Sequence, residues 1–148
     1  MKIRPYSPDD KQILVELLKL NIPDYFAPEE LNDFEEYLEN HLEYYYVVED
    51  SYHIVGAGGI NTTDRADTVR ISWDFFHPES QGHGFGSELL NYRIETIKKM
   101  NTVKVIEVRT SQLAYKFYQK SGFELMEIKK DFWAAGFDLY QMRLLIKH

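Results

Sequence analysis

Three glycines alternate with other residues in the segment 81–86, which reads Gln-Gly-His-Gly-Phe-Gly. The segment lies between an apolar run, residues 71–76, and an amphipathic run, residues 87–100. Glycine lets a backbone approach a ligand closely, and the peptide N–H groups that open a helix attract negative charge. The spacing therefore favours an anion-binding turn with phosphate as its natural ligand, although an ordinary strand-to-helix turn would use glycine in the same way.

Two carboxylates stand in otherwise apolar predicted strands. Asp74 lies near the end of the run that precedes the glycine turn, and Glu107 lies in the next predicted strand. Burial of an unpaired charge costs free energy, so each carboxylate needs a partner or a role. Each could act as a general base, or each could form a salt bridge, for instance Asp74 with Arg70 and Glu107 with Arg109.

The periodicity of apolar residues predicts the elements that position these side chains. The predicted order, β-α-α-β-β-β-α-β-α-β-β, indicates an α/β fold of the α+β type with a mixed central sheet of about six to seven strands. The predicted strands are residues 2–4, 44–49, 53–61, 69–76, 103–109, 123–128 and 137–146, and the predicted helices begin after Ser7, near residue 27, at residue 87 and at residue 113.

Side-chain directions follow from these assignments. Alternation along a strand places Ser72 and Phe76 on the same side as Asp74, and residues 131–136 are expected to connect the last two strands. The expected apolar faces are Ile13, Leu14, Leu17 and Leu18 in the first helix, and Leu89, Leu90, Ile94, Ile97 and Met100 in the helix after the glycine turn.

Composition narrows the class of protein. The chain of 148 residues suits one domain, and it contains no cysteine and no histidine pair at metal-ligand spacing, so a metal enzyme is not expected. The net charge of −7 argues against nucleic acid as the main partner. The start of the chain lacks the apolar core of a secretory signal, and no run approaches the roughly 20 apolar residues that span a bilayer, so a cytoplasmic protein without membrane contact is expected. Charge is uneven, because residues 20–64 hold eleven Asp and Glu but no Lys or Arg.

Two motifs in this chain resemble those of the GNAT N-acetyltransferase family. The family's phosphate-binding motif is Gln or Arg, two residues, Gly, one residue, then Gly or Ala, which Gln81, Gly84 and Gly86 match. Its second motif resembles residues 114–123, which read Ala-Tyr-Lys-Phe-Tyr-Gln-Lys-Ser-Gly-Phe. The resemblance implies that residues 1–148 form a single GNAT domain whose sheet is splayed between the fourth and fifth strands.

The resemblance also implies acetyl-CoA as the acyl donor. Backbone N–H groups of the glycine turn would bind the pyrophosphate, and the edge of the preceding strand would pair with the pantetheine arm. In many relatives an Asn before the second-motif helix contacts the pantetheine, and Gln112 could replace it here. The residues expected to bind CoA are Phe75, Phe76, Gln81, Gly82, His83, Gly84, Phe85, Gly86, Ser87, Gln112 and Phe117.

Catalytic roles follow from the same resemblance. Tyr118 stands four residues before Gly122, where the family's tyrosine lies, and would donate a proton or a hydrogen bond to the departing thiolate. Glu107 lies in a Glu-Val-Arg sequence like that of GNAT enzymes that acetylate ribosomal-protein N-termini, where the glutamate serves as base. Asp74 is the competing candidate for the base, and an ordered-water relay is a third.

The expected acceptor is a primary amine. In the family, the first two helices and their connection cover the acceptor side, and here the connection and the second helix lie in the acidic segment 20–64. That charge favours a cationic acceptor such as a polyamine, an amino sugar, a small amine or a peptide N-terminus, unless it is only a solvated helix face. The alternative function is a GNAT-like module that binds acyl-CoA or a partner protein without catalysis. A homodimer is left open.

Overall fold

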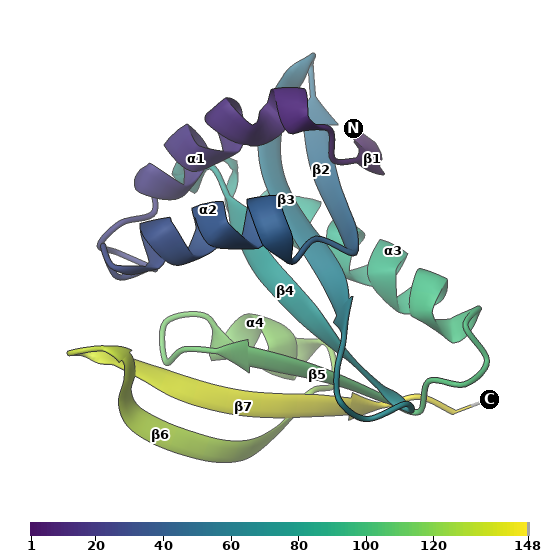
Figure 1. The fold of residues 1–148 in the computed structure, drawn as a ribbon. Coiled ribbons are helices and arrows are strands. Elements are labelled where there is room, and N and C mark those ends of the chain that lie inside the picture. Colours follow the sequence, from purple (N-terminus) through teal and green to yellow (C-terminus); the bar gives the residue numbers. More distant parts are fainter. Residues whose placement is uncertain (148) are drawn as a thin grey trace.

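The computed structural model describes residues 1–147 and contains one seven-stranded sheet in the order β1-β2-β3-β4-β5-β7-β6 (Figure 1). All neighbouring strands are antiparallel except β4 and β5, which run parallel. The strands are β1 (Lys2–Pro5), β2 (Tyr44–Asp50), β3 (His53–Thr62), β4 (Thr68–Phe76), β5 (Val105–Thr110), β6 (Glu124–Ala134) and β7 (Phe137–Leu145). The helices are α1 (Lys11–Lys19), α2 (Glu30–Asn40), α3 (Phe85–Lys98) and α4 (Tyr115–Lys120), with short 3-10 turns η1 (Pro8–Asp10) and η2 (Pro78–Ser80). The predicted fold class, element order and splayed mixed sheet are confirmed.

Helices cover both faces of the sheet, and each face has its own apolar core. Leu14 and Leu18 of α1 and Phe34 of α2 pack on one face. Leu89 and Leu90 of α3, with Tyr118 of α4, belong to the core on the other face. In Figure 1 the pair α1 and α2 lies on the opposite side of β3 and β4 from α3. Within the described part of the chain, no helix is long and apolar enough to cross a membrane.

The sheet splits between β4 and β5. Their pairing covers only Thr68–Ile71 of β4 and Val105–Val108 of β5. Figure 1 shows the two strands together near their starts and apart toward their ends. Since β5 continues along β7 and β4 continues along β3, the split separates the two halves of the sheet without ending either strand.

A bulge in β4 changes which side chains share a face. Ser72 pairs with Gly59 and Phe75 pairs with Ala57, so two residues of β4 lie opposite the single residue Gly58. An extra residue breaks the period-2 alternation. As a result, Ser72 lies against Tyr37 of α2, whereas Asp74 and Phe76 lie on the α3 side. The prediction that Ser72 shares a side with Asp74 was therefore wrong.

Two further details of the sequence prediction were wrong. The connection between the last strands does not comprise residues 131–136, because β6 continues to Ala134 through a register shift around Asp131, which has a φ of 54°. Ile13 is 51% exposed and does not join the buried face of α1. The other element boundaries agree with the prediction to within three residues.

Candidate active site

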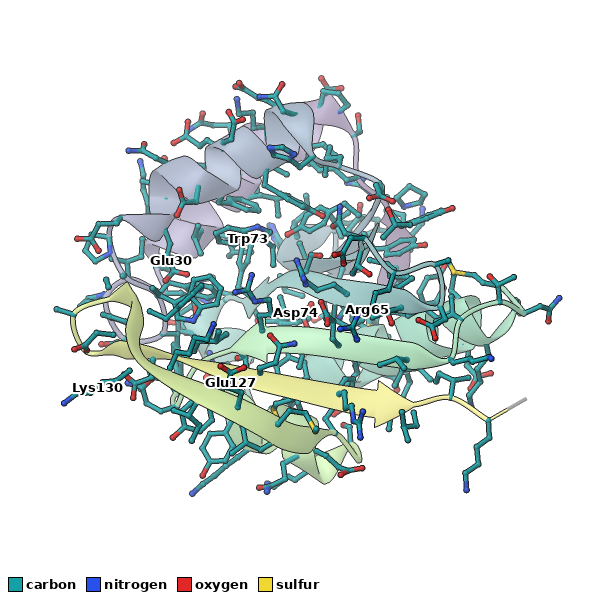
Figure 2. The ribbon with its side chains drawn as sticks, turned by 60° about the horizontal axis from the view of Figure 1, so that its bottom comes forward. Glu30, Arg65, Trp73, Asp74, Glu127 and Lys130 are labelled. Carbon is teal, nitrogen blue, oxygen red and sulfur yellow. The ribbon has the colours of Figure 1, made fainter. Side chains whose placement is uncertain are left out.

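A cavity of about 1060 Å³ opens where the sheet splits. Its lining comes from both halves of the sheet, the α1–α2 connection, α2, the glycine turn, α4 and the start of β7. Figure 2 shows Glu30, Trp73 and Asp74 between the helical layer of α1 and α2 and the strands β5 and β7. The cavity therefore has one wall near the glycine turn and another wall under the acidic helix α2.

The glycine turn reaches the cavity through backbone conformations that favour glycine. Gly82 and Gly84 have φ values of 85° and 82°, and Gly84 is the N-cap residue directly before α3. Space around both is open, since a Cβ at either position would have no neighbour within 4 Å. The first N–H groups of α3, those of Phe85, Gly86 and Ser87, have no acceptor within the helix and belong to residues that line the cavity, an arrangement that binds phosphate.

Most residues expected to bind CoA line this cavity. The lining includes Phe75, Phe76, Gln81, Gly82, Gly84, Phe85, Gly86, Ser87 and Phe117. His83 does not line it, and its ring stacks on that of Phe85 with the centroids 5.9 Å apart. Gln112 does not line it either, because its amide donates to the carbonyl of Gly136 at 2.6 Å and accepts from the N–H of Asp138 at 2.9 Å. Gln112 therefore connects the end of β5 to the β6–β7 turn through two hydrogen bonds.

Asp74 and Tyr118 meet at the cavity. The hydroxyl of Tyr118 donates to Oδ2 of Asp74 at 2.6 Å, and both residues line the space. Asp74 does not pair with Arg70 as the salt-bridge hypothesis had it. Its partner is Arg93 of α3, with Nη1 2.5 Å from Oδ1 and Nη2 2.8 Å from Oδ2.

Arg93 is a component of the site that sequence reasoning missed. Its side chain is fully buried, and Nη1 also donates to the carbonyl of Gly59 at 3.0 Å. A Cβ on Gly58 would lie 2.0 Å from Oδ1 of Asp74, so only glycine leaves room there for the ion pair. The available signal was its spacing, because Arg93 falls on the apolar stripe that includes Leu89 and Ile97.

Burial and charge alter the acidity of this trio. Burial raises the pKa of the Tyr118 hydroxyl well above its usual value, and the neighbouring Asp74 carboxylate raises it further. Burial acts to lower the pKa of Arg93, but the charge and hydrogen bonds of Asp74 raise it overall. Tyr118 is therefore a hydrogen-bond donor that keeps its proton.

Glu107 lies outside the cavity lining. Its Oε1 accepts from Nε of Arg70 at 2.7 Å and its Oε2 accepts from Gln141 at 3.4 Å. Glu107 therefore does form a salt bridge, as one hypothesis had it, but its partner is Arg70 and not Arg109. Both strands bring these residues together because Arg70 and Glu107 are register partners across β4 and β5.

Glu30 is a second component that was not singled out as a site residue. The side chain lines the cavity from the first turn of α2, and the residue is only 7% exposed. Oε2 accepts from the N–H of Ala27 at 2.8 Å, whereas Oε1 has no hydrogen bond to any of residues 1–147. Burial raises the pKa of Glu30 to about 7, with Asp33 and Glu29 adding to the rise and the Ala27 N–H opposing it.

The site is suited to an elongated ligand that carries phosphate at one end. Uncovered N–H groups lie at the start of α3, a strand edge free of β5 follows from Ser72 to Phe76, and the cavity continues to Asp74 and Tyr118. Such an order of groups fits a nucleotide-bearing thioester whose reactive end reaches the split. Within residues 1–147 no three His, Asp or Glu side chains are grouped as metal ligands.

Fold and site together define an acyltransferase with a CoA-type donor. The model of the GNAT acetyltransferase domain matches residues 16–146. The chain belongs to the GNAT acetyltransferase family, as the two sequence motifs indicated. No curated protein sequence matches the chain significantly.

Solved structures share this fold across the whole chain. An aminoglycoside 6'-N-acetyltransferase complexed with coenzyme A superposes with a TM-score of 0.80 at 16% identity, covering 100% of this chain and 99% of that one. The ribosomal-protein-S18-alanine N-acetyltransferase of Escherichia coli superposes with a TM-score of 0.81 at 15% identity, covering 99% of this chain and 94% of that one. The ribosomal-protein-alanine N-acetyltransferase of Brucella melitensis superposes with a TM-score of 0.77 at 19% identity, covering 99% of this chain and 100% of that one.

Proposed function

We propose that this protein transfers an acetyl group from acetyl-CoA to a primary amine, with residues 1–148 acting as one domain. The observation that carries the proposal is the single cavity that joins the uncovered start of α3 to the Asp74–Tyr118 pair through the split in the sheet. A donor bound along this path brings a thioester to the side chains that can assist its cleavage.

The reaction needs a neutral amine. Its nitrogen attacks the thioester carbonyl carbon, the carbon–sulfur bond breaks, one amine proton leaves to a base and the thiolate takes up a proton. A lysine-like amine has a pKa of about 10.4, so its neutralisation at pH 7 costs roughly 4.6 kcal/mol, against about 1.4 kcal/mol for an α-amine of pKa near 8. The need for a base therefore depends on the acceptor.

Tyr118 is proposed to stabilise the departing thiolate with a hydrogen bond. Its raised pKa makes full proton transfer to a thiol of pKa about 8.5 unfavourable, while a hydrogen bond to developing charge needs no transfer. For this role the hydroxyl gives up its hydrogen bond to Asp74 and forms one to the sulfur. The ion pair with Arg93 continues to balance the charge of Asp74 when that hydrogen bond is lost.

Three carboxylates are candidates for receiving the amine proton. Asp74 lines the cavity but has both oxygens beside Arg93, and Glu107 is engaged by Arg70 outside the lining. Glu30 lines the cavity with one oxygen free and a pKa of about 7, which suits a base at neutral pH. We therefore add Glu30 to the proposed bases, with a direct role or through ordered water.

The acceptor side is proposed to attract a cationic amine. Glu30 and Glu43 line this wall together with Trp73 and Tyr37. Negative charge in a partly enclosed site draws cations toward it. The similar structures named above belong to enzymes that act on aminoglycosides and ribosomal proteins. In this protein the walls of the cavity are proposed to select the acceptor.

The test is to measure acetyl-CoA binding and CoA release on the same protein. The expected result is binding by calorimetry together with CoA release that depends on an added amine from a panel of polyamines, amino sugars, amino acids and peptides. Tight acetyl-CoA binding without release for any amine would favour the alternative, a GNAT-like module that binds acyl-CoA without catalysis. Failure to bind acetyl-CoA would contradict both functions.

A further inference from the structure

Arg109 is a cation in the cavity without an ionic partner among residues 1–147. Its side chain is partly buried near the end of β5 and lines the cavity. No hydrogen bond or ion pair joins its guanidinium to any of residues 1–147. Burial lowers the pKa of Arg109, and the nearby Arg70 lowers it further, while Glu107 and Glu127 act in the opposite direction.

The nearby carboxylates leave Arg109 uncompensated because they have other partners. Glu107 accepts from Arg70 and Gln141, and Glu127 lies 3.7 Å from the ammonium of Lys129 on the exposed strand β6. A guanidinium offers five donors in a planar fork that matches a carboxylate, so an unpaired one in a cavity is a ready anion site.

Aromatic rings hold the guanidinium in place. Its Cζ lies 5.0 Å from the centroid of the Phe132 ring and 5.8 Å from that of Trp133. The indole N–H of Trp133 donates to the carbonyl of Thr110 at 3.1 Å, which fixes this ring to the end of β5. These cation–π contacts hold the guanidinium beside the rings without using its N–H groups in a hydrogen bond to a carboxylate.

Position on β5 assigns Arg109 to the acceptor wall. Ile106 and Val108 point into the core under α3, so Glu107 and Arg109 point to the opposite face, where Arg70 also lies. The uncovered N–H groups that suit a pyrophosphate lie instead at the start of α3. Arg109 thus has the charge of an anion site but lies on the wall opposite the donor's phosphates.

We propose that the acceptor carries a carboxylate as well as its amine, and that Arg109 binds this carboxylate while Glu30 attracts the amine from the helical wall. This inference rests on the proposed acetyl transfer and narrows its acceptor to amino-acid-type molecules. A simple polyamine or amino sugar would leave Arg109 unpaired.

The experiment compares acceptors that differ only at the carboxylate. Phenylalanine, leucine and glutamate are offered as free α-acids and as their α-carboxamides, and kcat/KM is measured by CoA release. Loss of a charge-assisted pair lowers kcat/KM by about tenfold or more. Arg109→Gln is therefore expected to lower kcat/KM by that factor for the acids and by less than about twofold for the amides, with Arg109→Lys intermediate. Each variant is compared with the wild type on the same acceptor, because the amine of the amide has a different pKa from that of the acid.

Arg65→Gln is the matched control. Arg65 is exposed in the β3–β4 connection, is labelled in Figure 2 and does not line the cavity, so its loss removes one positive charge without touching the site. This control is expected to leave the ratio of kcat/KM for the acid to kcat/KM for the amide at its wild-type value. An equal effect of Arg109→Gln on acids and amides would overturn the carboxylate site while leaving acetyl transfer intact.

A binding measurement separates this inference from the proposed function. The chain has two tryptophans, Trp73 and Trp133, and both line the cavity. Quenching of their fluorescence by N-acetylphenylalanine and by its carboxamide reports product binding without turnover. Tighter binding of the acid in the wild type and its loss in Arg109→Gln support the site even if no acceptor is turned over. Equal binding of both ligands in both proteins would overturn it.

Discussion

The hydroxyl of Tyr118 has two candidate partners, and only one can accept its hydrogen bond at a time. In the structure it donates to Asp74, and the proposed role in catalysis requires it to turn to the thioester sulfur. Because a buried hydroxyl with a raised pKa retains its proton, its effect is electrostatic stabilisation of the leaving group.

Replacing this hydroxyl tests its role. Tyr118→Phe is expected to lower turnover about tenfold or more while the Kd for acetyl-CoA changes little, since donor binding uses other groups. Steady-state kinetics and calorimetry on the same preparation measure both. Tyr52→Phe is the control, because Tyr52 is fully exposed. Unchanged turnover in Tyr118→Phe would remove this residue from the mechanism.

Glu30 predicts a pH dependence of stability. Burial raises the pKa of Glu30 from 4.5 to about 7, so the folded protein holds this proton more tightly than the unfolded chain. The contribution of this protonation to the free energy of unfolding is fully present below pH 4.5 and is lost as the pH rises through 7. This contribution amounts to about 3 kcal/mol.

Glu30→Gln removes the titrating group but keeps an oxygen for the Ala27 N–H. The free energy of unfolding, measured with urea between pH 5 and 8, is expected to fall more steeply with pH in the wild type than in the variant. Glu95→Gln, an exposed change on α3, is expected to follow the wild type. Parallel curves for the wild type and Glu30→Gln would contradict the assignment.

At the scale of elements, Arg93 ties α3 to two strands. Its guanidinium bonds to Asp74 on β4 and to the Gly59 carbonyl on β3, over the gap left by Gly58. Removal of one partner from a buried ion pair leaves an uncompensated charge, whereas removal of both does not.

Arg93→Met is therefore expected to lower the free energy of unfolding by about 3–5 kcal/mol, and Arg93→Met with Asp74→Asn by clearly less. Urea unfolding at one pH measures both, with Arg65→Met as an exposed control. Equal losses in the single and double variants would show that the pair matters only through packing.

Element prediction succeeded where the pattern was local. The glycine turn and α3 follow from adjacent residues, since Gly84 takes the left-handed conformation at the helix start. The bulge in β4 was missed because its cause, the pairing of Ser72 with Gly59, involves a strand distant in sequence. The extension of β6 to Ala134 depends in the same way on its pairing with β7.

At the scale of the whole molecule, the sheet consists of two halves joined by a short parallel pairing. Only four register pairs link β4 to β5, from Thr68–Val105 to Ile71–Val108. A donor bound in the split would contact both halves, so its binding energy adds to the stability of the whole fold.

Acetyl-CoA at about 100 times its Kd is expected to add about 2.7 kcal/mol and to raise the Tm by roughly 5–10 °C. Hydrogen exchange is expected to slow most at residues 72–76 and in the glycine turn, beyond the change in β1 and β2. Differential scanning calorimetry and exchange mass spectrometry measure these effects. Uniform slowing in all strands would place the donor elsewhere.

The sequence by itself determined the family, the order of elements and the glycine turn, because these depend on short-range periodicity and on motifs of adjacent residues. It also pointed to Tyr118 and Asp74 as separate candidates. Only the tertiary structure decided that these two are joined by a hydrogen bond, that Arg93 forms an ion pair with Asp74, that Glu107 pairs with Arg70, and that Arg109 lines the cavity without an ionic partner among residues 1–147. The reason is physical, since partners, burial and hence acidity arise from contacts between residues far apart along the chain, which no local pattern encodes.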